Sequence, residues 1–210
     1  MTLSVDFDAL PPAIRYKLLT AVVIPRPVAW ITTLNPDGSA NAAPYSFFNV
    51  FGQDPALVVL GLQHKADGSA KDTPANIGSS GEFVINIANV ALTEAMVATA
   101  TAYAPGVSEP EALELALAPS SKIATPRLAE APVALECRRV VSLTFSQERE
   151  LLVGEVIGLT AMDGLIDTDT WYVDWQGNWP IARLFGERYA RLEEIGAFPI
   201  PPAPQSQQEV

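Results

Sequence analysis

The order of strand-like and helix-like segments is the feature that most limits how this chain can fold. Hydrophobic runs typical of strands follow one another in 28–62 and again in 133–162, and helical segments are inserted between these groups rather than after each strand. Successive parallel strands need a crossover between them, so this order argues against a doubly wound parallel sheet. The sequence instead predicts a mainly β fold with inserted helices, built as an antiparallel barrel.

Turn signals between strand-like runs predict two antiparallel hairpins. Val28–Leu34 and Ser39–Ala43 flank Asn35-Pro36-Asp37-Gly38, in which Pro presets φ and Gly accepts a positive φ. Val133–Phe145 and Leu151–Met162 flank a charged turn. Further short strands are expected at Ala56–Leu62, Glu82–Ala88 and Trp171–Trp175, and helices at Phe7–Val22, Leu92–Ala102 and Glu111–Leu117.

The composition indicates one domain with one core. The chain has 210 residues, of which 49% are apolar, and its mean hydropathy is +0.19. These values exclude disorder of the whole chain and fit a single domain over residues 1–198. The end of the chain, residues 199–210, is rich in Pro and Gln and has little to bury, so it is expected to be a flexible tail.

The charge balance and the rare residue types exclude several kinds of partner and site. Against 24 Asp and Glu stand 13 Lys and Arg, which gives a net charge of −11. An acidic surface repels phosphate backbones, so binding to nucleic acid or to an anionic membrane is not expected. The single cysteine, Cys137, excludes an intrachain disulfide, and the single histidine, His64, excludes a His-rich metal site.

The start of the sequence and its apolar stretches give no sign of targeting. Residues 1–10 lack the basic region and apolar core of a secretory signal. The longest apolar stretches, at 56–62 and 151–162, are shorter than the roughly 20 residues that a membrane span needs. A cytoplasmic location is therefore expected.

The segment Lys71-Asp72-Thr73-Pro74 carries the clearest sign of a binding site. Proline is favoured at the first helical position, which predicts a helix that begins at Pro74 with Thr73 as its N-cap. Such a helix end presents free N–H groups and a partial positive charge, and Lys71 beside it completes a set of groups that bind a phosphate. Taken alone, the segment also fits, and more simply, an ordinary capped surface helix with a solvated lysine.

Two neighbouring segments offer residues that form pockets. In Asn41–Val50, small residues permit a close approach of the backbone and Ser46 offers a hydroxyl. Phe47 and the residue after it would point to opposite faces of a strand, one into the core and one toward a pocket. The strand before this segment carries hydroxyls on both faces, from Thr32 and Thr33. In isolation, each segment is explained as well by core packing.

His64 and Cys137 have reactive side chains but no supporting pattern. For His64, which follows a buried strand and precedes Lys71, a role as an acid or substrate contact and simple solvation are both open. The sequence contains no Gly-x-Ser-x-Gly turn, Walker-type loop or dinucleotide fingerprint. Cys137 lies among apolar strand residues and is expected to be a buried small hydrophobe.

Taken together and in order, these segments resemble the flavin reductase-like family, whose members fold as an FMN-binding split β-barrel and usually pair as homodimers. The resemblance covers roughly Leu18 to Tyr189, most of the chain. The segments that carry it are Arg26–Thr33, Asp37-Gly38, Asn41–Phe48, Asp54–Val58, Lys71–Thr73, Asn76-Ile77, Gly81–Asn86, Pro132–Cys137, Gly154–Val156, Arg183-Leu184 and Tyr189.

The resemblance implies a flavin site made from several parts of the chain. The stretches that are similar to the family's phosphate and ribityl contacts are Lys71, Asp72, Thr73 and Asn76. Those similar to the contacts of the flavin ring and its side chain are Thr32, Thr33, Ala43, Pro44, Tyr45, Ser46 and Phe47. The pieces that close the site near a partner subunit correspond to Arg183 and Tyr189.

The chain departs from the family pattern at two places. Family members often carry a Gly-Val-x-Glu-Phe loop, and Gly106–Pro110 has proline where the aromatic residue stands. The late Arg-Leu-Gly-Gly pattern has Phe185 in place of its first glycine. Both departures concern the pocket of the second substrate more than the binding of flavin.

The resemblance implies an FMN-dependent oxidoreductase, a NAD(P)H:flavin reductase. NAD(P)H would deliver a hydride to N5 of the flavin, and the electrons would pass to free flavin, oxygen or a redox partner protein. The cofactor supplies the reactivity, so no catalytic acid, base or metal is assigned. Two alternatives stay open: a flavoredoxin-like electron carrier that binds FMN but oxidises NAD(P)H poorly, and a barrel for another phosphorylated ligand such as a pyridoxal phosphate.

Overall fold

The main sheet of the computed structural model, which describes residues 2–201, has seven strands in the order β3-β2-β6-β9-β10-β5-β4. All neighbouring strands in it are antiparallel. The strands are β2 (Ala29–Leu34), β3 (Ala40–Tyr45), β4 (Phe48–Gln53), β5 (Ala56–Gln63), β6 (Glu82–Ile87), β9 (Val133–Ser146) and β10 (Arg149–Ala161).

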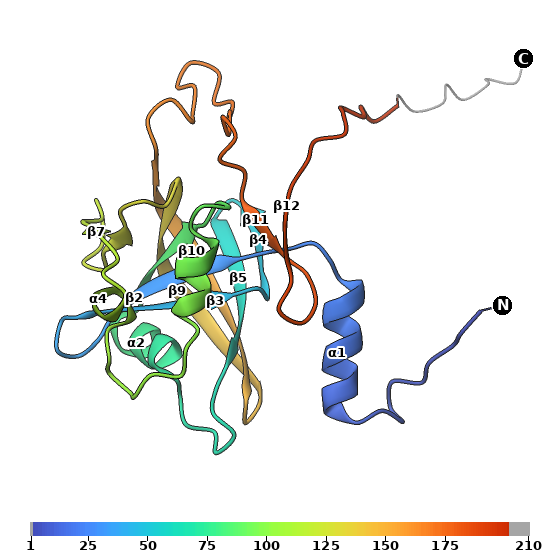
Figure 1. The fold of residues 1–210 in the computed structure, drawn as a ribbon. Helices are drawn as coiled ribbons and strands as arrows, with labels where there is room; N and C mark the ends of the chain where they lie inside the picture. Colours follow the sequence, from blue (N-terminus) through green and yellow to red (C-terminus); the bar gives the residue numbers. More distant parts are fainter. Residues whose placement is uncertain (1, 202–210) are drawn as a thin grey trace, which may run out of the picture.

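The two edges of this sheet are brought together by the chain itself. β3 and β4 lie at opposite edges, yet only Ser46 and Phe47 connect them. The sheet must therefore curl until its edges meet, and the Gly61 N–H of β5 donates a 2.7 Å hydrogen bond to the Phe47 carbonyl at this point. The result is the barrel in Figure 1. We call residues 43–47 together with Gly61 the seam.

The seam requires a residue without a side chain on β5. A Cβ atom on Gly61 would lie 2.9 Å from the Cβ of Phe47, closer than real contacts allow. The backbone of β5 approaches the Ser46-Phe47 connection this closely because glycine leaves the space free.

Both predicted hairpins are confirmed. In the first, Ala29 pairs with Tyr45 and Leu34 with Ala40. In the second, β9 and β10 pair along nearly their whole length, with register shifts that let the long strands bend around the barrel. Local turn chemistry was sufficient to predict these pairings.

The helices and the short strands lie around the barrel. They are α1 (Pro12–Val22), α2 (Asp72–Ser80), α3 (Thr93–Ala98), α4 (Glu109–Ala112), β1 (Arg26–Pro27), β7 (Leu117–Ala118), β8 (Arg127–Leu128), β11 (Ile181–Arg183) and β12 (Tyr189–Arg191). β11 pairs with both β1 and β12. Figure 1 shows α1 beside the barrel, next to the turn that joins β11 to β12.

The central strands are buried on both faces. On β2, Ile31 packs into one hydrophobic cluster with Phe83 and Leu152, whereas Trp30 packs into another with Met96. On β6, both the face with Phe83 and the opposite face with Val84 are buried. Three hydrophobic clusters therefore hold the strands that carry the site: one inside the barrel, one that includes Met96 of α3, and a small one around Val84.

Two predicted elements are wrong. Trp171–Trp175 forms no strand, only an isolated bridge between Ile166 and Val173, because the Asp167 side chain and carbonyl accept N–H groups and fold the segment into a turn. The helix expected at Glu111–Leu117 is α4 instead. It starts earlier because the Ser108 side chain accepts the Glu111 N–H, and it ends before Glu114, which has a φ of 55°.

The other predicted helices are shorter than expected, since α1 begins at Pro12 and α3 ends at Ala98. Of the predicted tail, 199–210, residues 199–201 are described and form no helix or strand, and the rest lies outside the described residues. Within residues 2–201, no helix combines the length and apolarity needed to cross a membrane.

Candidate functional site

A cavity of about 610 Å³ opens along the seam. This volume is within the range of pockets that bind cofactors, about 300–1,000 Å³. Its walls come from β3 and the Ser46-Phe47 connection, the first turn of α2, the segment after α3, one side of α1, and the β11–β12 turn. Segments far apart in the sequence thus contribute to one site.

Most of the predicted flavin-contacting residues meet in this cavity. Those that line it are Ala43, Pro44, Tyr45, Ser46, Phe47, Lys71, Asp72, Thr73, Arg183 and Tyr189. Phe47 faces the cavity with 40% of its surface exposed, while Phe48 packs against the core inside the barrel. The predicted division between the two phenylalanines is therefore confirmed.

Thr32, Thr33 and Asn76 do not line the cavity. Asn76 Nδ2 donates to Thr33 Oγ1 at 3.0 Å and to Asn35 Oδ1 at 2.9 Å, and all three residues are buried. On the other face of β2, the Thr32 hydroxyl donates to the Pro126 carbonyl at 2.6 Å. These side chains lie behind the wall and fix its shape.

The first turn of α2 differs from the prediction by about two residues. The helix begins at Asp72 with Lys71 at the cap position, so Thr73 is not the N-cap. Thr73 lies inside the first turn because its buried Oγ1 accepts Asn41 Nδ2 at 2.9 Å. Asn41 Nδ2 also reaches Thr33 Oγ1 at 3.3 Å. We refer to Thr33, Asn35, Asn41, Thr73 and Asn76 as the amide network.

The shifted start leaves donors at the cavity wall. The backbone N–H groups of Asp72 and Thr73 have no hydrogen-bond partner within residues 2–201, and Pro74 has no N–H. Lys71 lines the cavity beside them. Two free N–H groups, the positive end of a helix and an ammonium group are chemically suited to a phosphate.

Glu109, which the sequence analysis did not single out, lies in the same wall. Its Oε2 accepts the Ala42 N–H at 2.9 Å. Burial raises the pKa of Glu109, and the nearby Asp72 carboxylate adds to the rise. The only signal in the sequence was its place in the Gly106–Pro110 loop.

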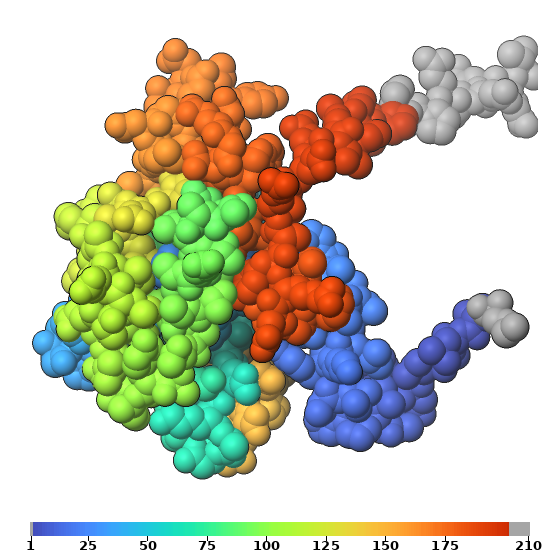
Figure 2. All heavy atoms as spheres, viewed as in Figure 1, coloured from blue at the N-terminus to red at the C-terminus, as the bar shows by residue number. Residues whose placement is uncertain are grey.

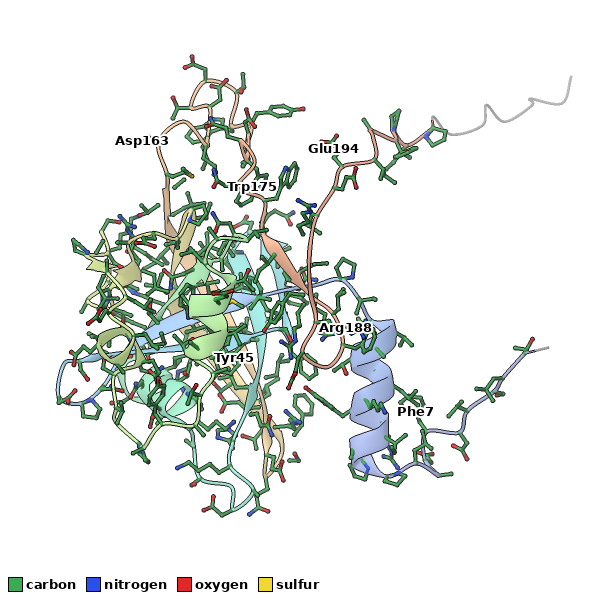
Figure 3. All side chains as sticks on the ribbon, viewed as in Figure 1. Phe7, Tyr45, Asp163, Trp175, Arg188 and Glu194 are labelled. Atoms are coloured by element: carbon green, nitrogen blue, oxygen red, sulfur yellow. The ribbon has the colours of Figure 1, made fainter. Side chains whose placement is uncertain are left out.

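Tyr45 brings a neutral hydroxyl to the cavity. Burial, aided by the carboxylates of Glu109 and Asp72 and opposed by a hydrogen bond with Thr73, raises the pKa of Tyr45 to about 12. The phenol is therefore protonated at neutral pH and able to donate a hydrogen bond. Figure 3 labels Tyr45 within the body of the barrel.

The opposite wall is held by Arg26, another residue that was not predicted. Arg26 Nη1 donates to the Thr20 and Val23 carbonyls at 2.6 and 2.8 Å, and Nη2 donates to the Leu184 carbonyl at 2.6 Å. The side chain is buried, with 8% of its surface exposed. One guanidinium therefore ties the end of α1 to the β11–β12 turn, which carries Arg188 in Figure 3.

The β11–β12 turn closes the cavity with a cation held over a ring. The Arg183 guanidinium lies 4.5 Å from the centre of the Tyr189 ring and donates to the Gly186 carbonyl. Figure 2 shows this segment, in red, between the rest of the barrel and α1, in blue. Arg183 and Tyr189 are thus oriented before any ligand binds.

The cavity gathers positive charge in an acidic protein. Five of the 13 Lys and Arg line it, against two of the 24 Asp and Glu. The cations are Arg26, Lys65, Lys71, Arg149 and Arg183, and the anions are Asp72 and Glu109. Within residues 2–201 the one ion pair joins His64 Nε2 to Glu150 Oε2 at 2.9 Å, so these five cations have no carboxylate partner. Unpaired cations in a cavity attract anionic ligands.

Cys137 and His64 lie outside the cavity walls. Cys137 is fully buried, and burial raises the pKa of its thiol, as expected for a core residue. His64 is engaged with Glu150 rather than solvated.

Comparison with known proteins connects this fold and cavity to a family. Residues 21–179 match the family model of the flavin reductase like domain. The chain belongs to the flavin reductase-like family. The predicted family and the predicted split-barrel fold are therefore confirmed.

Three solved structures are similar to this chain, and two of them, more than 30% identical, support this assignment. The 2-nitrobenzoate 2-nitroreductase NbaA of Pseudomonas fluorescens is 34% identical, with a TM-score of 0.88 over 98% of this chain and 100% of its own. Nitrilotriacetate monooxygenase component B from Bacillus cereus is 33% identical, with a TM-score of 0.88 over 94% of this chain and 99% of its own. A Shewanella frigidimarina protein with a split barrel domain is 21% identical, with a TM-score of 0.80 over 92% of this chain and 96% of its own. At this identity it supports the fold alone.

Proposed function

We propose that this protein is an FMN-dependent oxidoreductase that acts as a NAD(P)H:flavin reductase. The observation that carries the proposal is the meeting, in one cavity, of Lys71, the unpartnered N–H groups of α2 and the seam. The family supplies the reaction class, and the cavity supplies groups that suit a phosphorylated, polyhydroxylated, planar cofactor.

The residues present fit FMN part by part. Lys71 and the N–H groups of Asp72 and Thr73 suit the phosphate. The carboxylates of Asp72 and Glu109 are acceptors that suit the hydroxyl groups of a ribityl chain. The seam offers the Phe47 ring and the neutral Tyr45 hydroxyl for the flavin ring system.

In this reaction the chain binds, orients and shields rather than transferring protons. FMN, when bound, supplies the chemistry by accepting a hydride from NAD(P)H and passing the electrons onward. The Ser46 hydroxyl and the protonated Tyr45 are donors able to stabilise negative charge at the ring. The Arg183–Tyr189 pair and α1 limit access of water from the open side.

Replacement of Lys71 by Ala tests the phosphate site. We expect FMN binding to weaken by about 1.5–3 kcal/mol, roughly 10- to 150-fold, which is the value of a charge-assisted hydrogen bond. Fluorescence titration of FMN measures the dissociation constant, and Lys122→Ala, which removes an exposed lysine outside the cavity, is the control. Equal FMN affinity in Lys71→Ala and wild type would contradict the proposal.

Reduction tests the reaction itself. Anaerobic addition of NADH or NADPH to the FMN-loaded protein should bleach the flavin absorbance within seconds to minutes. A flavin spectrum that persists with both nucleotides would favour the electron carrier over the reductase.

We also propose that two copies pair. Large apolar side chains are exposed on the strands of the barrel, with Phe51 and Val50 of β4 at 70% and 73% exposure and Phe145 of β9 at 71%. Exposed apolar groups in such numbers favour burial against another protein surface. Light scattering of the FMN-loaded protein should give the mass of a dimer, and a monomer mass would contradict this proposal.

A further inference from the structure

We propose that Lys65 and Arg149, together with Tyr16, form a second oxyanion subsite at the rim of the cavity. Its ligand is the anionic group of the molecule that exchanges electrons with the cofactor, so this inference rests on the proposed function. We call these three residues the rim cluster. All three line the cavity, and none belongs to the flavin-contacting set implied by the family resemblance.

The backbone holds the two cations of the rim cluster close together. Arg149, the first residue of β10, pairs with Gln63 at the end of β5. His64, which follows Gln63, donates its N–H to the carbonyl of Glu148, the residue before Arg149, at 3.0 Å. The Lys65 N–H then donates to the Ser69 carbonyl at 2.9 Å and closes the following turn. Both cations are therefore attached to paired strand ends.

Aromatic contacts connect the rim cluster to the seam. The Arg149 guanidinium lies 6.0 Å from the centre of the Tyr16 ring, and the Tyr16 ring lies 6.1 Å from the ring of Phe47. A guanidinium over a ring keeps its N–H edge free for a carboxylate or phosphate. A planar molecule near Phe47 would thus bring an attached oxyanion toward Arg149.

No carboxylate forms an ion pair with the rim cluster within residues 2–201, although Asp67 is near enough for the charge of Lys65 to help lower the pKa of Asp67. Glu150 follows Arg149, but strand alternation directs the two side chains to opposite faces. Glu150 is also engaged by His64 at 2.9 Å. Neither Lys65 nor Arg149 makes an ion pair within the described part of the chain. The histidine thereby has a role, since it binds the carboxylate of the residue next to Arg149.

The phosphate of FMN does not account for this charge. The cavity has three more cations than carboxylates, whereas a phosphate monoester brings about two negative charges at neutral pH. The proposed phosphate site uses α2, whereas the rim cluster comes from α1, β10 and the turn after β5. A second anion therefore fits the charge that remains.

Two sources share this chemistry: the phosphates of a nicotinamide nucleotide and the carboxylate of an aromatic acceptor. Calorimetric titration of the FMN-loaded protein with the unreactive probes NAD⁺, NADP⁺, nicotinamide mononucleotide and benzoate separates them. The variants are Arg149→Gln, Lys65→Gln and the double variant. The control is Arg139→Gln, which removes an exposed arginine of β9 outside the cavity.

We expect Arg149→Gln to weaken at least one probe about tenfold and the double variant to weaken it more, as for lost charge-assisted hydrogen bonds. FMN affinity in both and probe affinity in Arg139→Gln should stay within twofold of wild type. An effect on the nucleotides supports a dinucleotide donor as the ligand, and an effect on benzoate supports an aromatic acid. If the double variant does not fold, Lys65→Gln, in an exposed turn, carries the test.

Two results would overturn the inference alone: equal probe affinities in wild type and the rim variants while FMN remains bound, or no probe binding to FMN-loaded wild type. Failure of the wild-type protein to bind FMN would overturn the proposed function and this inference with it.

Discussion

The two walls of the cavity are built in different ways. The α2 wall is backed by the amide network, whose buried side chains bond to one another across α2, β2 and β3. The α1 wall has little packing behind it: Thr20 is the one buried residue of α1, and Tyr16 and Leu19 are 52% and 49% exposed. Figures 1 and 2 show α1 standing out from the barrel.

This difference matches two tasks within one site. Buried, mutually bonded polar side chains fix a wall rigidly, because breaking any bond leaves an unpaired group. A helix held by one buried guanidinium and by ring contacts of the exposed Tyr16 is easier to displace. We therefore expect the α2 wall to retain a cofactor and the α1 wall to admit and release a second molecule.

The largest expected effect comes from removing the centre of the amide network. Asn76→Ala deletes the bonds to Thr33 and Asn35. It leaves the buried Asn35 Oδ1 without a donor and Thr33 Oγ1 with only the 3.3 Å bond from Asn41, which should lower the free energy of unfolding by about 2–4 kcal/mol. Urea unfolding measures this loss. Ser79→Ala, at an exposed position of the same helix, should change stability by less than about 0.5 kcal/mol. Similar small losses in both variants would contradict a rigid α2 wall.

On the α1 wall we expect a smaller loss in the free energy of unfolding but a larger local loosening of the helix. Arg26→Met frees the carbonyls of Thr20, Val23 and Leu184, which water can then reach, so the loss in unfolding free energy should be about 1–2 kcal/mol. Amide hydrogen exchange in α1 should accelerate at least about tenfold. Lys17→Met, on the exposed side of α1, serves as the control. Unchanged exchange in α1 of Arg26→Met would mean that other contacts hold the helix.

The sequence was informative where the signal is local. The hairpin around Pro36 and Gly38 and the helix that starts next to Lys71 follow from turn and helix-end chemistry within a few residues. The resemblance brought Arg183 and Tyr189 to the same site before any geometry was known.

Contacts between distant segments could not be predicted in this way. Arg26 acts on Leu184, 158 residues away, and Glu109 accepts the Ala42 N–H from 67 residues away. β4 was missed because it lacks alternation, since its residues after Phe48 are all exposed. Thr33 and Asn76 were expected at the surface of the site, but their chemistry serves equally to hold that surface in place.

The smallest expected effect is on the α2 wall, at Glu109. Because burial raises the pKa of Glu109, the folded state disfavours the ionised carboxylate. In Glu109→Gln the amide oxygen still accepts the Ala42 N–H, but no charge is buried. At a pH above the raised pKa, wild type is therefore less stable than this variant. The variant should melt about 2 °C higher at pH 7. The difference in melting temperature between variant and wild type should disappear as the pH falls through the raised pKa of Glu109 toward the ordinary pKa of a glutamate.

Thermal unfolding between pH 4 and pH 8 measures this gap. Glu111→Gln, at an exposed position of the same helix, should show no such trend. A gap for Glu109→Gln that widens on acidification would show that the carboxylate stabilises the fold.

The two-residue connection between β3 and β4 has a consequence for the order of assembly. Joining the edges of a sheet normally requires segments far apart in the chain to find each other, and the entropy lost in closing such a loop slows folding. Here Ser46 and Phe47 make that junction between strands that are adjacent in sequence. The seam, the wall beside the proposed flavin ring, is thus produced by the contiguous stretch 29–63 and does not wait for the C-terminal segments that later enclose it.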